Sequence, residues 1–289
     1  MAEEDTMLAS EAHAPRAQAE PGPSLADGLV YALGQIGYDY PSRSRRAALQ
    51  QRMDESANPD DAASLLAHLE ANPYDASAVH WTLNLDGAPL YFLEPTGPFA
   101  SETYELLRSF LREQLEEGVE RVSVPGVIAG SARHRSGIDL PVVVPFMSGM
   151  YSWTTKALVA SVTEGARKSR DKGIGDLGEA VSGFLERVYF ELRNLGREPH
   201  DRALNFAATN AFEVARVYER AIVERAELDS IEVEPSTVGP PGGDCWDVKL
   251  VFFYPEREAN AVRRVFRFTV DVADVVPATV GAMRTWSIR

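Results

Sequence analysis

The chain has 289 residues, of which 45 % are apolar and 25 % charged, and its formal net charge is −14. Because a nucleic-acid partner requires clustered positive charge to pair with phosphates, this balance argues against one. The single cysteine excludes an intramolecular disulfide, and no apolar run reaches the roughly 18 residues of a membrane span. We therefore expect a cytoplasmic protein without a membrane segment, built as one large domain or two small ones.

The N-terminus is acidic and rich in Ala, Glu and Pro, and it lacks the basic and apolar regions of a signal peptide. We expect a disordered tail over residues 1–24, with a transient helix over Glu4–Ala19 as the alternative. Residues 25–289 are expected to form a single ordered domain.

The ordered part begins with an apolar segment, dotted with glycine, that ends before Pro41 because a residue before proline avoids the helical region. Residues 43–69 then read as two short helices separated at Asn58–Pro59. Two alternating runs flank Asp86–Gly87, the strongest short-range signal for a β-hairpin. One face of this hairpin would carry Trp81, Leu83 and Leu85.

Helical spacing continues from Ser101, with Glu102 in the first turn. The apolar positions of this helix are Tyr104, Leu107, Phe110, Leu111 and Leu115. Residues 120–127 and 138–146 read as strands, and their prolines favour sheet edges or strand ends. The prolines are Pro125, Pro141 and Pro145.

Further helices are expected over Trp153–Lys168, Ala180–Leu195 and about Arg202–Arg225. The chain then becomes strand-rich over residues 229–234, 246–254 and 263–274, and the last two runs alternate as a half-buried antiparallel pair. Because helices and strands are segregated, we predict an α+β fold, a single domain with antiparallel hairpins and several packed helices.

The stretch Gly173–Gly178 matches G-x-G-x-x-G and precedes a helix. A dinucleotide site also needs a buried strand just before the glycines, whereas here the preceding residues are polar. We interpret the stretch as a flexible loop between helices.

A metal site is one alternative for the single cysteine, Cys245, which lies between Asp244 and Trp246. A zinc site could join Cys245 to His134 or His200, because ligands need only meet in space. The histidines show no ligand spacing, so a lone thiol without a cofactor is the preferred interpretation.

Two groups of polar residues are candidate peptide contacts. Arg133, His134 and Arg135 form a basic cluster suited to a carboxylate or an acidic peptide, with a solvated loop as the simpler alternative. The first half of the helix from residue 202 carries no charged face, which predicts that it is buried. Its side-chain amides and hydroxyl then need hydrogen-bond partners. Those amide and hydroxyl residues are Asn205, Thr209 and Asn210. Neighbouring backbone is the preferred partner, and a bound peptide is the alternative.

Long stretches of the sequence together resemble the C-terminal domain of the PatA and PatG proteins of cyanobactin biosynthesis. They include VYALGQIGYDY, HWTLNLDGAPLYFLEPTGPFA, FLERVYFELRNLG, DRALNFAATNAF and DCWDVKLVFFYP. The resemblance runs from about Leu29 to Ser287, without the protease domain that precedes it in those proteins. The peptide-binding proteins of the crocagin pathway are similar. The second cysteine that the family carries before D-C-W-D is missing here, which puts any two-cysteine metal site in doubt.

The resemblance implies a role in handling a precursor peptide of a ribosomal-peptide pathway. Our first hypothesis is a non-catalytic protein that binds this peptide and presents or protects it for the modifying enzymes. Residue type and position add Tyr151, Trp153 and Trp246 to the expected peptide contacts. A metal-dependent enzyme using Cys245, Asp244, Asp247 and His200 is one alternative, and an oligomeric scaffold for pathway enzymes is another. We expect a homodimer, with the precursor and pathway enzymes as partners.

Overall fold

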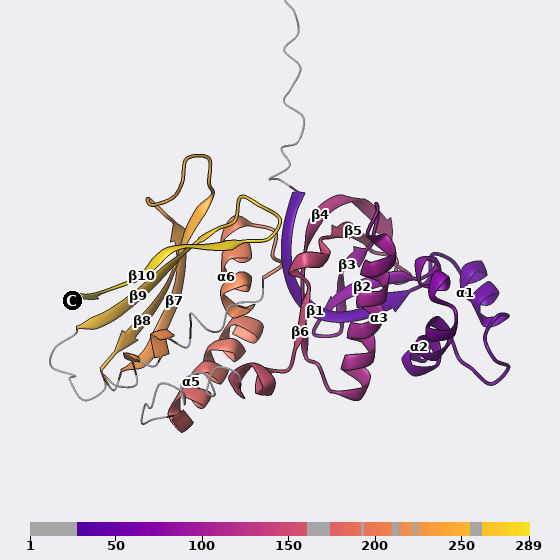
Figure 1. Cartoon of the computed structure of the whole chain (residues 1–289), viewed down its shortest axis with the longest axis horizontal. Helices are drawn as coiled ribbons and strands as arrows, with labels where there is room; N and C mark the ends of the chain where they lie inside the picture. The colour runs from indigo at the N-terminus through magenta and orange to yellow at the C-terminus, as the bar shows by residue number, and fades with distance from the viewer. Residues whose placement is uncertain are drawn as a thin grey trace, which may run out of the picture.

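The computed structural model describes residues 28–160, 174–191, 194–209, 214, 216–218, 220–221, 224, 226–254 and 262–289. Two sheets dominate it, one in each half of the chain, with helices beside and between them (Figure 1). The fold is α+β, which confirms the sequence prediction. None of the described helices is long and apolar enough to cross a membrane. The tail expected over residues 1–24 lies outside the described residues.

The first sheet curls around a long strand, β1, which the sequence shows only as an apolar segment before Pro41. Its strands are β1 (Leu29–Asp39), β2 (His80–Leu85), β3 (Ala88–Leu93), β4 (Arg121–Arg133), β5 (Asp139–Pro145) and β6 (Tyr151–Trp153). The first half of β1 pairs with β4 and its second half with β2. Because β2 pairs with β3, β3 with β5 and β5 with β4, the pairings form a closed ring. β6 adds to β4 outside that ring.

The β2–β3 hairpin confirms the prediction made from Asp86–Gly87. Both residues have positive φ, 50° and 78°, as the tight turn requires. Trp81 and Leu83 are fully buried on one face, whereas Leu85 is only partly buried.

Pro125 overturns part of the sequence interpretation, because it lies within the central strand β4 and not at a sheet edge. On one side β4 pairs with β1 through this region. On its other side β4 pairs with β6 up to Ser123 and with β5 from Gly126 onward. Pro125 lies where β4 changes its partner from β6 to β5. The N–H that proline lacks is therefore not needed for a hydrogen bond of the sheet.

Three helices and a 3₁₀ turn accompany the first sheet: α1 (Arg43–Gln50), α2 (Ala62–Ala71), the turn η2 (Pro73–Ala78) and α3 (Ala100–Glu116). The two short helices expected over residues 43–69 are therefore confirmed. The long helix begins one residue before Ser101, with Phe99 as an N-cap that makes no side-chain hydrogen bond. Leu107, Phe110 and Leu111 enter the core, whereas Leu115 is 48 % exposed, contrary to its predicted place on the buried stripe.

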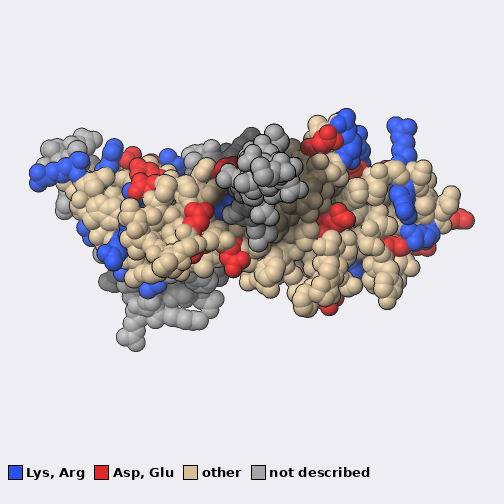
Figure 2. Space-filling view, turned by 90° about the horizontal axis from the view of Figure 1, so that it is seen from above, with Lys and Arg blue, Asp and Glu red and all other residues tan. Residues whose placement is uncertain are grey.

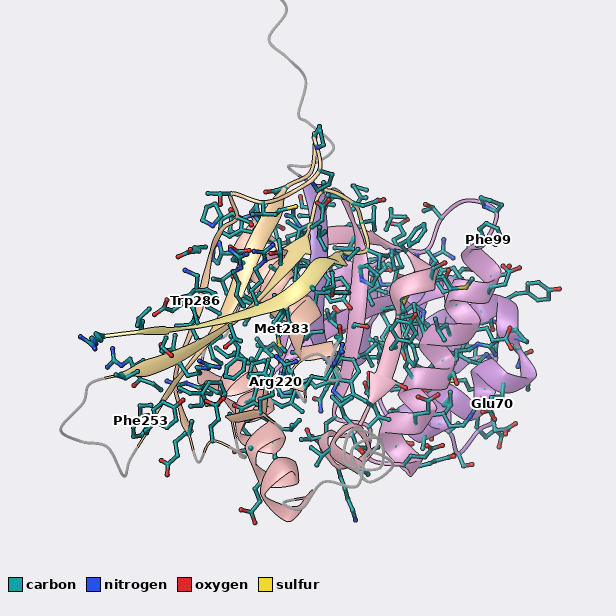
Figure 3. The ribbon with its side chains drawn as sticks, turned by 60° about the vertical axis from the view of Figure 1, so that its left-hand side comes forward. Glu70, Phe99, Arg220, Phe253, Met283 and Trp286 are labelled. Carbon is teal, nitrogen blue, oxygen red and sulfur yellow. The ribbon has the colours of Figure 1, made fainter. Side chains whose placement is uncertain are left out.

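The second sheet is a four-stranded antiparallel sheet in the order β10-β9-β8-β7. Its strands are β7 (Glu227–Pro235), β8 (Cys245–Phe253), β9 (Arg263–Asp271) and β10 (Ala278–Ile288). β7, β8 and β9 match the predicted strands. β10, which carries Met283 and Trp286 (Figure 3), was not predicted.

Helices pack on one face of the second sheet: α5 (Ile174–Glu186), a π-turn η4 (Arg187–Glu191) and α6 (Pro199–Thr209). Gly175 and Gly178 lie inside α5, so the loop predicted over the glycine-rich stretch is wrong. Trp153 ends strand β6 and does not begin a helix; residues 155–160 are helical, and the rest of that predicted helix lies outside the described residues.

β1 contributes to two hydrophobic cores at once. Val30 and Ala32 pack with the helices of the first sheet, whereas Tyr31 and Leu33 pack with α5, α6 and the second sheet. Successive side chains of a strand point to opposite faces, so one strand serves both halves of the molecule.

Candidate functional site

A basic hollow of about 520 Å³ opens where β1 ends and α1 begins. It is lined by Asp39, Tyr40, Pro41, Ser42, Arg43, Arg46, Arg133, His134 and Arg135. The predicted Arg133–Arg135 cluster therefore forms one wall, at the end of β4. In Figure 2, Lys and Arg side chains lie at both ends of the molecule, including the end that carries α1 in Figure 1. The hollow concentrates positive charge in a protein whose formal net charge is −14.

The sequence around Pro41 builds the other wall. Pro41 follows the end of β1, and Ser42 caps α1 by accepting a hydrogen bond from the Arg45 backbone N–H at 3.1 Å. The cap fixes the direction of α1, so that Arg43 and Arg46 both line the hollow.

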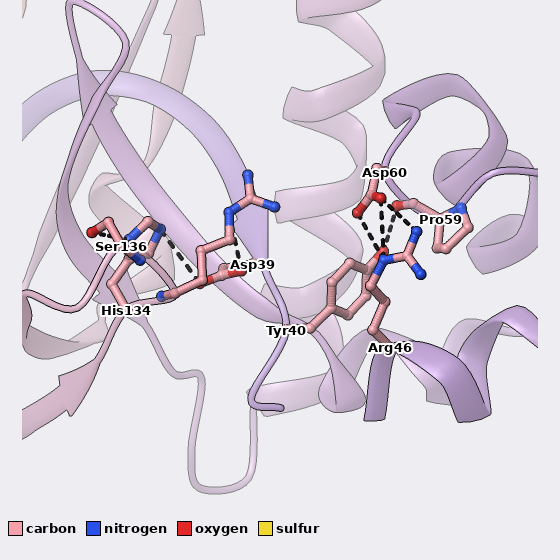
Figure 4. A network of polar contacts seen from close by, with 8 residues as sticks. Asp39, Tyr40, Arg46, Pro59, Asp60, His134 and Ser136 are labelled. Carbon is pink, nitrogen blue, oxygen red and sulfur yellow. Dashed lines mark hydrogen bonds and ion pairs between the residues drawn. The ribbon is translucent and has the colours of Figure 1, made fainter. Parts of the chain in front are cut away.

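Asp39 forms the floor of the hollow, and its side chain is only 2 % exposed. Its carboxylate accepts the backbone N–H of Arg135 at 3.0 Å and lies 3.4 Å from Nε2 of His134 (Figure 4). Nδ1 of His134 accepts the backbone N–H of Ser136 at 3.1 Å, so the ring proton belongs on Nε2, facing Asp39. This network fixes the β4–β5 turn against β1.

The arginines of the hollow differ in how firmly they are held. Arg46 donates two hydrogen bonds through Nε, at 3.0 and 3.1 Å, to the carboxylate of Asp60. Arg133 meets Asp139 at 3.1 Å, with both side chains more than half exposed. Arg43 makes no ion pair within the part of the chain that the structure describes. Guanidinium groups are thus available for a carboxylate ligand.

A second hollow of about 430 Å³ adjoins the first and shares Pro41 with it. Its lining includes Val79, His80, Phe92, Tyr104, Ala132 and Val142, together with the charged residues Arg45 and Glu94. The His80 ring meets Phe92 edge-on at 4.9 Å between centroids, and Phe92 lies 6.0 Å from the His134 ring. Burial lowers the pKa of His80, which keeps this imidazole neutral. We call the two hollows together the Pro41 cleft.

The predicted aromatic contacts Tyr151 and Trp153 lie on β6, and neither lines the Pro41 cleft. Tyr151 is 60 % exposed. Trp153 is partly buried, and its Nε1 donates to the hydroxyl of Tyr189 at 3.0 Å.

The helix residues Asn205 and Thr209 lie between the two halves of the molecule. Nδ2 of Asn205 donates to the carbonyl of Tyr31 at 2.9 Å, and the Thr209 hydroxyl is 3.0 Å from the Tyr31 hydroxyl. The first half of α6 is buried as predicted, and its polar groups find neighbouring protein groups as partners. Asn210 lies outside the described residues.

Cys245, His200 and Trp246 gather at the second sheet, whereas His134 belongs to the first. The ring of His200 lies 5.9 Å from that of Trp246, whose Nε1 donates to Asp244 at 2.8 Å. Burial raises the pKa of the Cys245 thiol, and Asp271 and other nearby carboxylates add to the shift. Within the described ranges, no group of three His, Cys, Asp or Glu residues is arranged to hold a metal ion.

Sequence reasoning found one wall of the Pro41 cleft and missed the others. The missed residues are Asp39, Arg43, Arg46, His80 and Phe92. The basic run Arg43–Arg46 just after Pro41 was a usable signal, because it repeats the charge pattern of the Arg133–Arg135 cluster. The aromatic wall has no such signal, since His80 and Phe92 meet only through strand pairing.

Comparisons with known proteins agree with this architecture. The family described as "PatG Domain" matches residues 29–135, and "PatG C-terminal" matches residues 172–286. A solved structure described as "PatG Domain of Unknown Function" is 42 % identical, with a TM-score of 0.79, and the match covers 91 % of this chain and 100 % of that one. No curated protein matched the chain. The chain therefore belongs to the PatG domain family.

Proposed function

We propose that this protein binds the precursor peptide of a ribosomally synthesised, modified peptide without altering it, and delivers it to modifying enzymes. The PatG relationship supports the pathway context. The observation that carries the binding role is the Pro41 cleft, with adjoining hollows of about 430 and 520 Å³. Volumes of this order suit segments of a peptide or small ligand. One hollow is lined by aromatic and apolar side chains together with Arg45 and Glu94, and the other offers guanidinium groups.

Titration of the purified protein with the precursor encoded beside its gene tests this proposal, with calorimetry for binding and mass spectrometry for chemistry. We expect saturable binding and an unchanged peptide mass. A changed mass after incubation with this protein alone would make it an enzyme. If the peptide neither binds at high micromolar concentration nor changes in mass, the scaffolding alternative remains.

A further inference from the structure

We propose that the Pro41 cleft recognises an acidic stretch of the peptide, with two or more carboxylate side chains in the basic hollow and an apolar side chain in the adjoining one. This inference rests on the proposed function for the identity of the ligand as a peptide. It adds which chemical class of segment is bound, and where.

Local charge is the first argument. The basic hollow is lined by four arginines and one acid, and two of the arginines, Arg46 and Arg133, are paired with the nearby carboxylates of Asp60 and Asp139. The acid, Asp39, is 2 % exposed and already accepts the Arg135 backbone N–H. It therefore offers little repulsion at the surface. Such a concentration of positive charge opposes the overall charge of −14 and favours a polyanionic ligand.

The state of the guanidinium groups is the second argument. Arg43 has no ion-pair partner among the described residues, and Nε of Arg135 lies 3.5 Å from Asp39 with the side chain 64 % exposed. The Arg133–Asp139 pair is exposed at both ends, so exchanging its carboxylate costs little. Arg43 is thus free to bind a carboxylate, and the exposed Arg133 and Arg135 can exchange their present partners for one, whereas Arg46 stays engaged with Asp60.

The positions of these guanidinium groups favour a ligand with several carboxylates over a ligand with only one. A single terminal carboxylate is satisfied by one bidentate guanidinium. Here the guanidinium groups belong to two parts of the chain, the start of α1 and the end of β4 with the turn that follows it, and all of them line a hollow of about 520 Å³. The start of α1 adds the positive end of its helix dipole. A run of acidic side chains can reach guanidinium groups on both parts of the chain, whereas the single carboxylate of a peptide C-terminus cannot.

The adjoining hollow is lined by apolar side chains, of which Phe92 and Val142 are 3 % and 8 % exposed, and also by Arg45 and Glu94. Phe92 and Val142 belong to a small cluster on the sheet face opposite the main core, and Ala132 packs beside them. The two hollows share Pro41, so one extended segment can reach both. An acidic segment with an interspersed apolar residue fits this order of surfaces.

Two double variants of the full chain test the assignment. Arg43→Gln with Arg135→Gln removes two guanidinium groups of the cleft. Arg284→Gln with Arg289→Gln, at β10 and the chain end in the other half, makes the same change in net charge. We expect the cleft variant to bind the precursor at least tenfold more weakly and the control variant within about twofold of the parent. Equal affinities for all three proteins would overturn this inference and leave the proposed function intact.

Capped probe peptides separate the inference from the proposed function. We expect acetyl-Glu-Glu-Leu-Glu-Glu-Leu-amide to bind at least tenfold more tightly than its Gln counterpart, and the cleft variant to abolish the difference. That result would stand even if the natural precursor failed to bind. Failure of the Glu peptide to bind at millimolar concentration, or equal binding of both peptides, would contradict the inference. So would equal binding by the Gln peptide carrying a free C-terminal carboxylate, which would assign the cleft to chain ends.

Discussion

The side-chain amide of Asn205 donates a hydrogen bond of 2.9 Å to the backbone carbonyl of Tyr31, which joins α6 to β1. Tyr31 is held twice more, since its backbone N–H donates to the carbonyl of Gly196 at 2.8 Å and its hydroxyl lies 3.0 Å from Thr209. One residue of β1 is therefore tied to the second half of the molecule through all its polar groups.

Replacing Asn205 by leucine is expected to destabilise the fold by about 1–3 kcal/mol, because it removes a partner from a buried carbonyl. Chemical denaturation followed by circular dichroism gives this value. If Asn205 serves only this contact, affinity for the precursor measured well below the unfolding midpoint stays unchanged. A loss of affinity in a fully folded Asn205→Leu variant would instead support the peptide contact predicted from sequence.

Gly196→Ala is expected to cost more than about 2 kcal/mol. Gly196 has φ of 69°, and a Cβ there would lie 2.1 Å from the carbonyl oxygen of Tyr31, a backbone atom that cannot move aside. Gly242→Ala is the matched control, because Gly242 has φ of 82° and no atom near the position of its Cβ. We expect it to cost about 1 kcal/mol, from the dihedral alone. Equal losses in the two variants would contradict the close approach of Gly196 to β1.

Alkaline pH is expected to unfold the protein cooperatively as its buried tyrosines ionise. Burial raises the pKa of Tyr38 to about 12, with Asp60 and Asp61 adding to the shift, and burial also raises the pKa of Tyr189 and Tyr218. Because these folded-state pKa values exceed the ordinary value of about 10, the stabilisation is complete below pH 10 and is lost as pH rises further. The part of the tyrosinate absorbance that comes from the buried tyrosines should therefore change together with circular dichroism. Ionisation of every tyrosine before any loss of structure would contradict this expectation.

The thiol of Cys245 is expected to react slowly with thiol reagents in the native state. Burial and the neighbouring carboxylates raise its pKa, so little thiolate forms near neutral pH. The rate of reaction with a disulfide reagent should be well below that of glutathione at pH 7.5 and should increase after denaturation. A native rate equal to that of glutathione would place this thiol in an open, activating environment.

The sequence predicted elements whose signal is local and missed those whose signal is not. The Asp86–Gly87 turn, the amphipathic pattern of α3 and the alternation of β8 and β9 each lie within a few residues. The turn was correct, and the two patterns identified the core faces, although Leu115 is exposed and Asp247 and Thr269 on the outer face are buried. β10 was missed because its exposed side chains show little alternation, and pairing with β9 defines it. The helix predicted from Trp153 begins only at residue 155, because pairing with β4 extends the backbone of Tyr151–Trp153.

The Pro41 cleft shows the same limit. Arg133, His134 and Arg135 were identified because they are consecutive, but their charge becomes a cavity wall only opposite Arg43, 90 positions away in the sequence. His80 and Phe92 occupy a hairpin that was predicted correctly. Their contact with the basic cluster depends on the closure of the first sheet through β1, β4 and β5, which no local pattern encodes.

Alternate side chains of β1 pack into two different cores, and this has a consequence for cutting the chain into two fragments. A chain cut between residues 160 and 174 would leave the C-terminal piece without Tyr31 and Leu33, and so with a bare apolar surface on α6. We expect the C-terminal fragment to expose this apolar surface until β1 of the other fragment covers it, so β1 makes the second half of the molecule depend on the first.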